Sequence, residues 1–152
     1  MTAGQVNRAV VADRVALIRR LLDEAGTLPL DDLGDFTRDA RMVAAGESYL
    51  RRALEALLDI GRHVLARGFA RGPSEYAEVA RQLGDVRVLS PEQSERLVLM
   101  ARYRNRLVHG YREVTVPELY DLLARRLDDI DKIVAAVTAW MAEHPDRVSD
   151  GD

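Results

Sequence analysis

Apolar side chains recur every three or four residues along most of this chain, which is the spacing of one face of an α-helix. The clearest run lies between residues 39 and 67, and we find no alternation of apolar and polar residues typical of half-buried strands. The pattern therefore predicts an all-α fold in which helices pack their apolar faces together. In that run the residues sharing one face are Val43, Leu50, Leu54, Leu57, Leu58 and Leu65.

Helix start and stop signals divide the chain into five predicted helices. Glycine can take the left-handed conformation that ends a helix, so Gly26, Gly68 and Gly110 are expected to end the first, second and fourth. Capping sequences at Ser90 and Thr115 are expected to begin the fourth and fifth. The predicted helices cover residues 6–25, 39–67, 75–83, 90–109 and 115–144.

These segments favour an up-down helical bundle built around two long antiparallel helices, the second and the fifth. Residues 29–36 are acidic and rich in turn-forming residues, and we expect no helix there. Residues 1–144 are expected to form a single domain, because a chain of 152 residues is long enough for one core. Residues 145–152, which begin at Pro145, are expected to be a disordered C-terminal tail.

The composition restricts the classes of function. The net charge of −3 argues against a general nucleic-acid coat protein, so any contact with RNA is expected at a local site. The chain has no cysteine, and no carboxylate–histidine cluster has the spacing of metal ligands, so we predict no metal and no cofactor. No apolar run is long enough to cross a membrane, and a cytoplasmic location is expected.

The most informative motif runs from Arg104 and Asn105 to His109, with Tyr111 two residues further on. A histidine can transfer a proton near neutral pH, and an arginine can bind a phosphate through two parallel hydrogen bonds. Together they provide what phosphodiester chemistry needs when no metal takes part. Two structural interpretations stay open: Arg104 forms a salt bridge with an acid such as Asp59, or His109 only interacts favourably with the helix dipole.

The second predicted helix has a further face away from its leucines. Asp59 and His63 project there together with Arg52. Tyr49, Ala56 and Ile60 lie beside them, and Arg104 interrupts an apolar stripe of the fourth predicted helix. We therefore expect a two-fold dimer through the second and fourth helices, in which this face packs on a second copy of the chain. The alternative for the polar residues is a solvated helix surface.

The order of these pieces resembles the HepT-like ribonuclease toxins of the HEPN superfamily. The resemblance covers residues 35 to 140 and rests on Arg104-Asn105, His109-Gly110-Tyr111, and the upstream helix from Glu55 to His63. Ser74-Glu75-Tyr76 and Leu89-Ser90-Pro91-Glu92 fit the family's middle section.

The resemblance implies a dimeric, all-helical endoribonuclease toxin that cuts RNA without a metal and acts in a toxin–antitoxin system. It implies that Arg104 and His109 are catalytic, that Asn105 is the polar residue next to the arginine, and that Tyr111 is modified. We expect Asn105, Asp59 and His63 to assist the catalytic pair, with Asp59 holding Arg104 in place. The modifying partner would be an MntA-like nucleotidyltransferase antitoxin, which adds AMP to Tyr111 and silences the nuclease.

Two other functions remain open from the sequence. The bundle can be a non-catalytic binding or dimerisation partner of a nucleotidyltransferase, in which case loss of His109 would be tolerated. It can also be a purely structural dimer whose polar residues form interface salt bridges.

Overall fold

The computed structural model describes residues 4–109 and 114–150, and the fold within these ranges is all-α. It contains seven α-helices, a 3₁₀ turn and two short strands. The helices are α1 (Arg8–Ala25), α2 (Leu33–Thr37), α3 (Ala40–Phe69), α4 (Tyr76–Asp85), α5 (Pro91–His109), α6 (Val116–Arg125) and α7 (Leu127–Glu143). The strands are β1 (Val6–Asn7) and β2 (Val148–Ser149), and the turn covers Pro145–Arg147.

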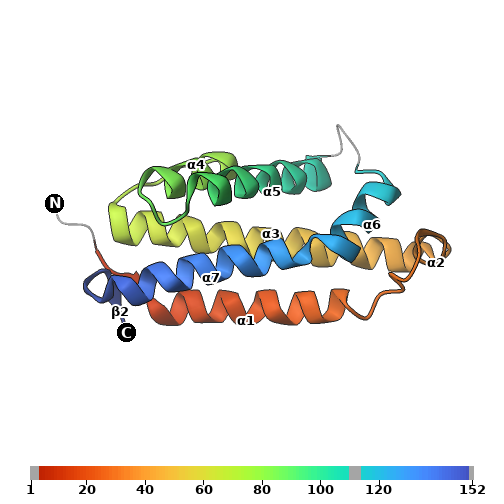
Figure 1. The fold of residues 1–152 in the computed structure, drawn as a ribbon, viewed down its shortest axis with the longest axis horizontal. Helices are drawn as coiled ribbons and strands as arrows, with labels where there is room; N and C mark the ends of the chain where they lie inside the picture. The colour runs from red at the N-terminus through yellow and green to blue at the C-terminus, as the bar shows by residue number, and fades with distance from the viewer. Residues whose placement is uncertain (1–3, 110–113, 151–152) are drawn as a thin grey trace.

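Helices α1, α3, α5 and α7 run along the length of the molecule in alternating directions, which confirms the predicted up-down bundle (Figure 1). The 30-residue helix α3 lies at its centre and contacts α1, α4, α5 and α7. Its buried side chains include Leu57, Leu58 and Leu65, each at most 1% exposed. The periodic leucines therefore form the core, as their spacing indicates.

Helices α4 and α5 form a tightly packed pair on one side of α3. The hydroxyl of Ser94 on α5 donates a buried hydrogen bond of 2.8 Å to the carbonyl of Ala80 on α4. A Cβ atom added at Gly84 would lie 2.7 Å from that hydroxyl, so the glycine permits the close approach. This packing fixes the start of α4 beside the C-terminal half of α5, where the candidate site lies.

The apolar face expected around Ala56 and Ile60 is not free. Both side chains are only 2% exposed, because neighbouring helices of the same chain pack around α3. The prediction that these residues are left for a second copy of the chain is therefore wrong. Tyr49 is half-buried against the same core.

The structure differs from the sequence prediction on both sides of α3, at residues 33–37 and at the end of the helix. Residues 33–37 form α2, where no helix was expected, and Asp32 caps it by accepting a hydrogen bond from the Asp35 amide. Helix α3 does not end at Gly68 but at Phe69, and Ala70 takes the left-handed cap with φ 54°. Gly68 instead permits close packing, since a Cβ there would lie 3.3 Å from the side chain of Val6.

The predicted long fifth helix is two helices, so α3 has no second helix of comparable length. The Thr115 capping box begins α6 as expected, but Arg126 leaves the helical conformation with φ −120° and ψ 0°. Leu123 packs closely on Gly46 of α3, where an added Cβ would lie 2.7 Å from its Cδ1. The chain then turns so that α7 can run along the bundle (Figure 1).

The described part of the predicted disordered tail, residues 145–150, is ordered against the bundle. Strand β2 pairs in parallel with β1, with Val148 opposite Val6. Arg147 Nη1 donates a 2.6 Å hydrogen bond to the carbonyl of Gly68. The prediction of a disordered tail is therefore wrong for these residues, because Val148 is 7% exposed and backbone pairing satisfies its polar groups.

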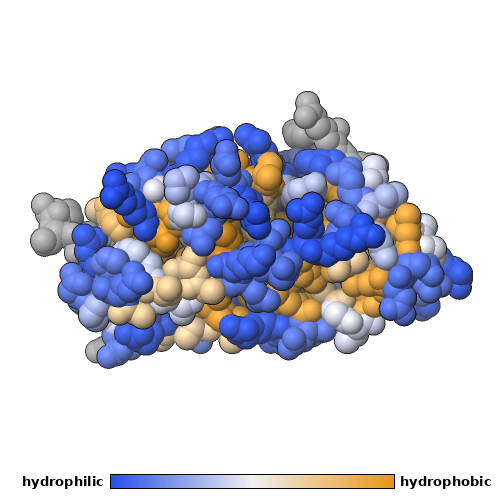
Figure 2. Space-filling model, viewed as in Figure 1, coloured by the Kyte–Doolittle hydropathy of each residue, from blue (hydrophilic) through white to orange (hydrophobic). Residues whose placement is uncertain are grey.

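The surface alternates between charged and apolar regions, as Figure 2 shows for the face seen in Figure 1. Leu99 and Val108 on α5 are 54% and 43% exposed. None of the helices in the described ranges has the length and hydropathy to span a membrane.

Candidate functional site

Arg104 lies largely buried between α5 and α3, where an isolated charge would be unfavourable. Its Nη2 atom donates to Glu55 Oε2 at 3.3 Å, and its Nη1 atom donates to Asn105 Oδ1 at 3.2 Å. Its Nε atom is buried without a hydrogen-bond partner among the described residues. The guanidinium is therefore held in a fixed place and keeps hydrogen-bonding capacity.

Tyr76, the first residue of α4, forms the aromatic support of this site. The guanidinium carbon of Arg104 lies 4.9 Å from the ring centroid, and that of Arg62 lies 4.6 Å from it. The Tyr76 hydroxyl donates to Asp59 Oδ1 at 2.9 Å. Burial, followed by this hydrogen bond and the charge of Asp59, raises the pKa of the Tyr76 phenol, so it stays a neutral donor.

These groups line one side of a pocket of about 490 Å³. His109, the last residue of α5, is exposed at the same pocket, so the structure brings it together with Arg104 and Asn105. An arginine, a histidine and an amide around one cavity are suited to holding an anion and moving a proton beside it. The pocket is lined by Arg62, Ser74, Glu75, Tyr76, Ala77, Arg104, Asn105 and His109.

Two predicted auxiliary residues do not contact Arg104. Asp59 bonds to Tyr76 instead, so the expected Asp59–Arg104 contact is wrong, and Glu55 takes that place one helical turn earlier. His63 lies away from the pocket, where its Nε2 atom accepts a 3.0 Å hydrogen bond from the Asn7 amide. Burial, and then the nearby Arg67 charge, lowers the pKa of His63, in keeping with a neutral, structural histidine.

Three residues of the site were missed as functional residues by the sequence reasoning: Glu55, Arg62 and Tyr76. Glu55 lies four residues before Asp59 on the same helix face, so the sequence contained a signal for either carboxylate. Tyr76 follows a turn after α3, and only the path of residues 70–75 brings it over the two arginines.

Tyr111 lies outside the described residues. The helices on either side of that segment are joined by Arg106 of α5 and Glu118 of α6, whose atoms meet at 2.9 and 3.1 Å. This hydrogen bonding lowers the pKa of the Glu118 carboxyl. Because Glu118 also completes the capping box of α6, the ion pair fixes the start of α6 relative to the end of α5.

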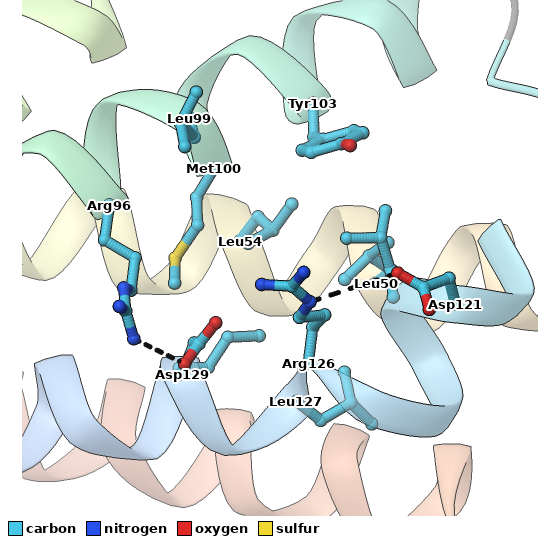
Figure 3. Close-up of a pocket in the computed structure, with 12 residues that line it drawn as sticks. Leu50, Leu54, Arg96, Leu99, Met100, Tyr103, Asp121, Arg126, Leu127 and Asp129 are labelled. Carbon is cyan, nitrogen blue, oxygen red and sulfur yellow. Dashed lines mark hydrogen bonds and ion pairs between the residues drawn. The ribbon is translucent and has the colours of Figure 1, made fainter. Parts of the chain in front are cut away.

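A second hollow of about 310 Å³ lies between α3, α5, α6 and α7, and Figure 3 shows its lining. Its walls combine apolar side chains such as Leu54 and Met100 with two ion pairs, Arg96–Asp129 at 2.9 Å and Arg126–Asp121 at 3.9 Å. None of the predicted site residues that the structure describes lines it. It offers no histidine, so it is less suited to acid–base chemistry than the Arg104 pocket.

Among residues 4–109 and 114–150, no group of three or more histidine or carboxylate side chains is arranged to hold a metal ion. In the pocket, Arg104, Arg62 and Asn105 can bind an anion, and His109 can transfer a proton.

Known proteins are similar to this chain in sequence and in fold. The chain is 22% identical over 136 residues to a tRNA nuclease HepT of Aphanizomenon flos-aquae (strain 2012/KM1/D3), covering 90% of this chain and 92% of that protein. Its fold is similar to a tri-AMPylated HEPN toxin of Shewanella oneidensis in complex with an MNT antitoxin (TM-score 0.78, 21% identity, 86% of this chain and 97% of the other). It is also similar to YutE of Bacillus subtilis, a cytosolic protein of unknown function (TM-score 0.77, 19% identity, 95% and 97% covered).

The family model for HepT-like ribonucleases matches residues 15–137, which is most of the chain and includes every described residue lining the Arg104 pocket. The all-α bundle, the arginine–histidine pocket and this match agree with one another, and the chain belongs to the HepT-like ribonuclease family.

Proposed function

We propose that this protein is a metal-independent endoribonuclease, the toxin subunit of a toxin–antitoxin system that acts in the cytoplasm. The observation that carries the proposal is the pocket in which Arg104, Asn105 and His109 meet. Membership of a ribonuclease family and the similarity to a tRNA nuclease support RNA as the substrate.

The proposed chemistry uses the 2′-hydroxyl of RNA as the nucleophile. Arg104 binds the scissile phosphate and stabilises the charge that develops on it. His109 takes the proton from the 2′-hydroxyl or gives one to the leaving 5′-oxygen, and Asn105 orients the imidazole or the RNA. The products are a 2′,3′-cyclic phosphate and a 5′-hydroxyl end. Glu55 holds Arg104 in place at 3.3 Å.

The proposed partner is an MntA-like nucleotidyltransferase antitoxin that adds AMP to Tyr111. Support comes from the similar fold of a tri-AMPylated HEPN toxin that was solved with an MNT antitoxin. Tyr111 follows His109 by two residues, so AMP added there introduces negative charge near the pocket. That charge repels incoming RNA and competes for the arginines.

We further propose that the chain acts as a homodimer whose subunits face each other along α5. This helix carries Arg104 and His109, and it also exposes Leu99 and Val108. A two-fold contact is the commonest way to cover such apolar side chains. Light scattering of the unmodified protein at micromolar concentration tests it, and a monomeric mass would count against the dimer.

The test of the nuclease is RNA cleavage in excess chelator by the parent protein and by His109→Ala. Acid–base help of this kind contributes about 10²–10⁴-fold, so the variant should be slower by that factor. His144→Ala is the matched control, since His144 stacks on Trp140, outside the lining of the Arg104 pocket. Equal rates for His109→Ala and the parent would favour the second candidate, a non-catalytic binding partner of a nucleotidyltransferase.

A further inference from the structure

Arg62 is the second arginine of the Arg104 pocket, and the proposed reaction gives it no role. It lies on α3, and its Nη2 atom donates a 3.0 Å hydrogen bond to the carbonyl of Ser74. Its nearest carboxylate contact is long, 3.7 Å from Nη1 to Asp59 Oδ1. The side chain is 39% exposed and lines the pocket, so a ligand there can reach the guanidinium.

The Tyr76 ring fixes the distance between the two arginines. Each guanidinium carbon lies within 5 Å of the ring centroid, so the two are at most about 10 Å apart. Their shared aromatic support and separate anchors, Ser74 for Arg62 and Glu55 for Arg104, hold them as two distinct cationic groups on one cavity. Because the two groups are this close, a single strand bound to Arg104 by one phosphate can place a neighbouring phosphate within reach of Arg62.

The hydrogen bonding of Arg62 leaves room for a ligand. A guanidinium has five N–H donors, and the bond to Ser74 uses one of them. A purely structural arginine at this place would be expected to share a close, two-point contact with Asp59, but Asp59 is engaged by the Tyr76 hydroxyl at 2.9 Å. Among the residues that line the pocket, the two arginines face a single carboxylate, Glu75. Glu55 and Asp59 do not line it but pair with the arginines at 3.3 and 3.7 Å, so they balance part of the positive charge.

We propose that Arg62 binds the phosphate next to the scissile one, so that the pocket takes RNA segments with at least two consecutive phosphates. This inference rests on the proposed ribonuclease function, because it defines the neighbouring phosphate by the one that Arg104 holds. It makes Arg62 a residue for substrate binding and Tyr76 the positioning residue for both arginines.

The test compares a dinucleoside monophosphate, which has a single phosphate, with an oligoribonucleotide that extends the same sequence. The readout is the ratio of kcat/KM for the longer substrate to that for the shorter one, measured on the full chain. Arg62→Gln should lower this ratio about tenfold, the effect of losing one charge-assisted hydrogen bond. Arg81→Gln is the matched control: Arg81 pairs with Glu78 on α4 outside the pocket, and its loss should leave the ratio unchanged.

The ratio distinguishes the loss of one phosphate contact from a general loss of activity or stability. A variant that merely misplaced Arg104 or destabilised the fold would lose activity on both substrates alike and keep the ratio, and that result would overturn the proposal. A change of similar size in Arg81→Gln would overturn it as well.

If the parent protein cuts neither substrate, the nuclease function alone is refuted. The second phosphate contact is then tested by measuring RNA binding to proteins that carry His109→Ala. The fluorescence anisotropy of the labelled longer oligoribonucleotide is then followed against salt. Arg62→Gln should weaken binding and reduce the slope of log K against log salt by about 0.7, the value for one phosphate contact on a single strand. An unchanged slope would overturn the second phosphate contact.

Discussion

Glu55 on α3 binds Arg104 on α5 across 49 residues of sequence, with 3.3 Å between Oε2 and Nη2. The same carboxylate accepts a 2.6 Å hydrogen bond from Arg51 through its other oxygen. Glu55 therefore balances the charge of a largely buried arginine and connects the candidate site to the central helix of the bundle.

Glu55→Gln should lower both stability and activity. The amide keeps an acceptor but loses the charge that balances Arg104, which we expect to reduce the free energy of unfolding by about 1–2 kcal/mol. Misplacement of the guanidinium should reduce kcat for RNA by up to about 100-fold. Urea unfolding and cleavage rates measure these effects, with the exposed Glu47→Gln on the same helix as the control. A variant as active and stable as the parent would show that Asn105 suffices to hold Arg104.

Two replacements of Tyr76 should distinguish the contribution of its ring from that of its hydroxyl. Tyr76→Phe keeps the ring under Arg62 and Arg104 and loses only the bond to Asp59, so its KM for RNA should stay near that of the parent. Tyr76→Leu removes both cation–π contacts, which contribute about 0.5–1 kcal/mol each, and should raise KM several-fold. If the phenylalanine variant is the weaker of the two, the hydroxyl rather than the ring organises the site.

The stability of the fold should fall in mild acid because of His63. Its folded-state pKa lies below the usual value near 6.5, so the unfolded chain binds the proton more readily. The stabilisation is therefore present above that value and is lost as the pH falls below it towards the lower pKa of the folded state. His63→Gln, which keeps an acceptor for the Asn7 amide, should flatten the profile of Tm against pH over this range. An identical slope in both proteins would place the acid sensitivity elsewhere.

Gly61→Ala should loosen the packing of α4 on α3. A Cβ at this position would lie 2.8 Å from Leu83 Cδ1 and 3.0 Å from Val79 Cγ1, so both side chains would have to shift. Such overpacking costs about 1–3 kcal/mol, seen as a lower midpoint in urea. Gly72→Ala is the control, because no atom lies within 4 Å of an added Cβ there. An unchanged urea midpoint in Gly61→Ala would mean that α4 shifts to accept the methyl group without a loss of stability.

Tyr111 should carry the AMP groups added by the cognate nucleotidyltransferase. Co-expression followed by intact-mass analysis should give whole AMP increments on the parent protein and none on Tyr111→Phe, since the phenylalanine has no hydroxyl to modify. The phenylalanine variant should stay toxic in the presence of the partner. Tyr103→Phe, on α5, serves as the control and should still be modified. Increments that persist on Tyr111→Phe would assign the modification to another residue.

The sequence predicted the helical class and the residues of one cluster because both depend on local spacing. The periodic leucines of α3 are buried, and the motif from Arg104 to His109 does line one pocket. The interruption at Arg126 was missed because neither glycine nor proline marks it. Leu123, three residues before the interruption, packs on Gly46, and local spacing does not reveal such a contact between segments far apart in the sequence.

The acid that pairs with Arg104 could not be predicted from the local spacing of residues either. Glu55 and Asp59 are four residues apart and lie on one face of α3, so their angular positions are nearly the same. The choice between them depends on how far α5 is displaced along α3, which the periodicity of either helix leaves undetermined. The role of Tyr76 depends on the same displacement, because it lies beside Arg104 only after α4 and α5 have packed.

The pairing of β1 with β2 has a practical consequence for engineering the molecule. The two strands lie side by side at one end of the bundle, whereas α5 ends with His109 towards the other end (Figure 1). Because the strands are parallel, a linker that joins them must run back from the end of β2 to the start of β1. Each strand has only two residues, so this return is short. New ends opened in the turn of residues 86–90, between α4 and α5, would then give a circular permutant. In such a permutant the order of the helices changes, while the Arg104 pocket is assembled from the same helices.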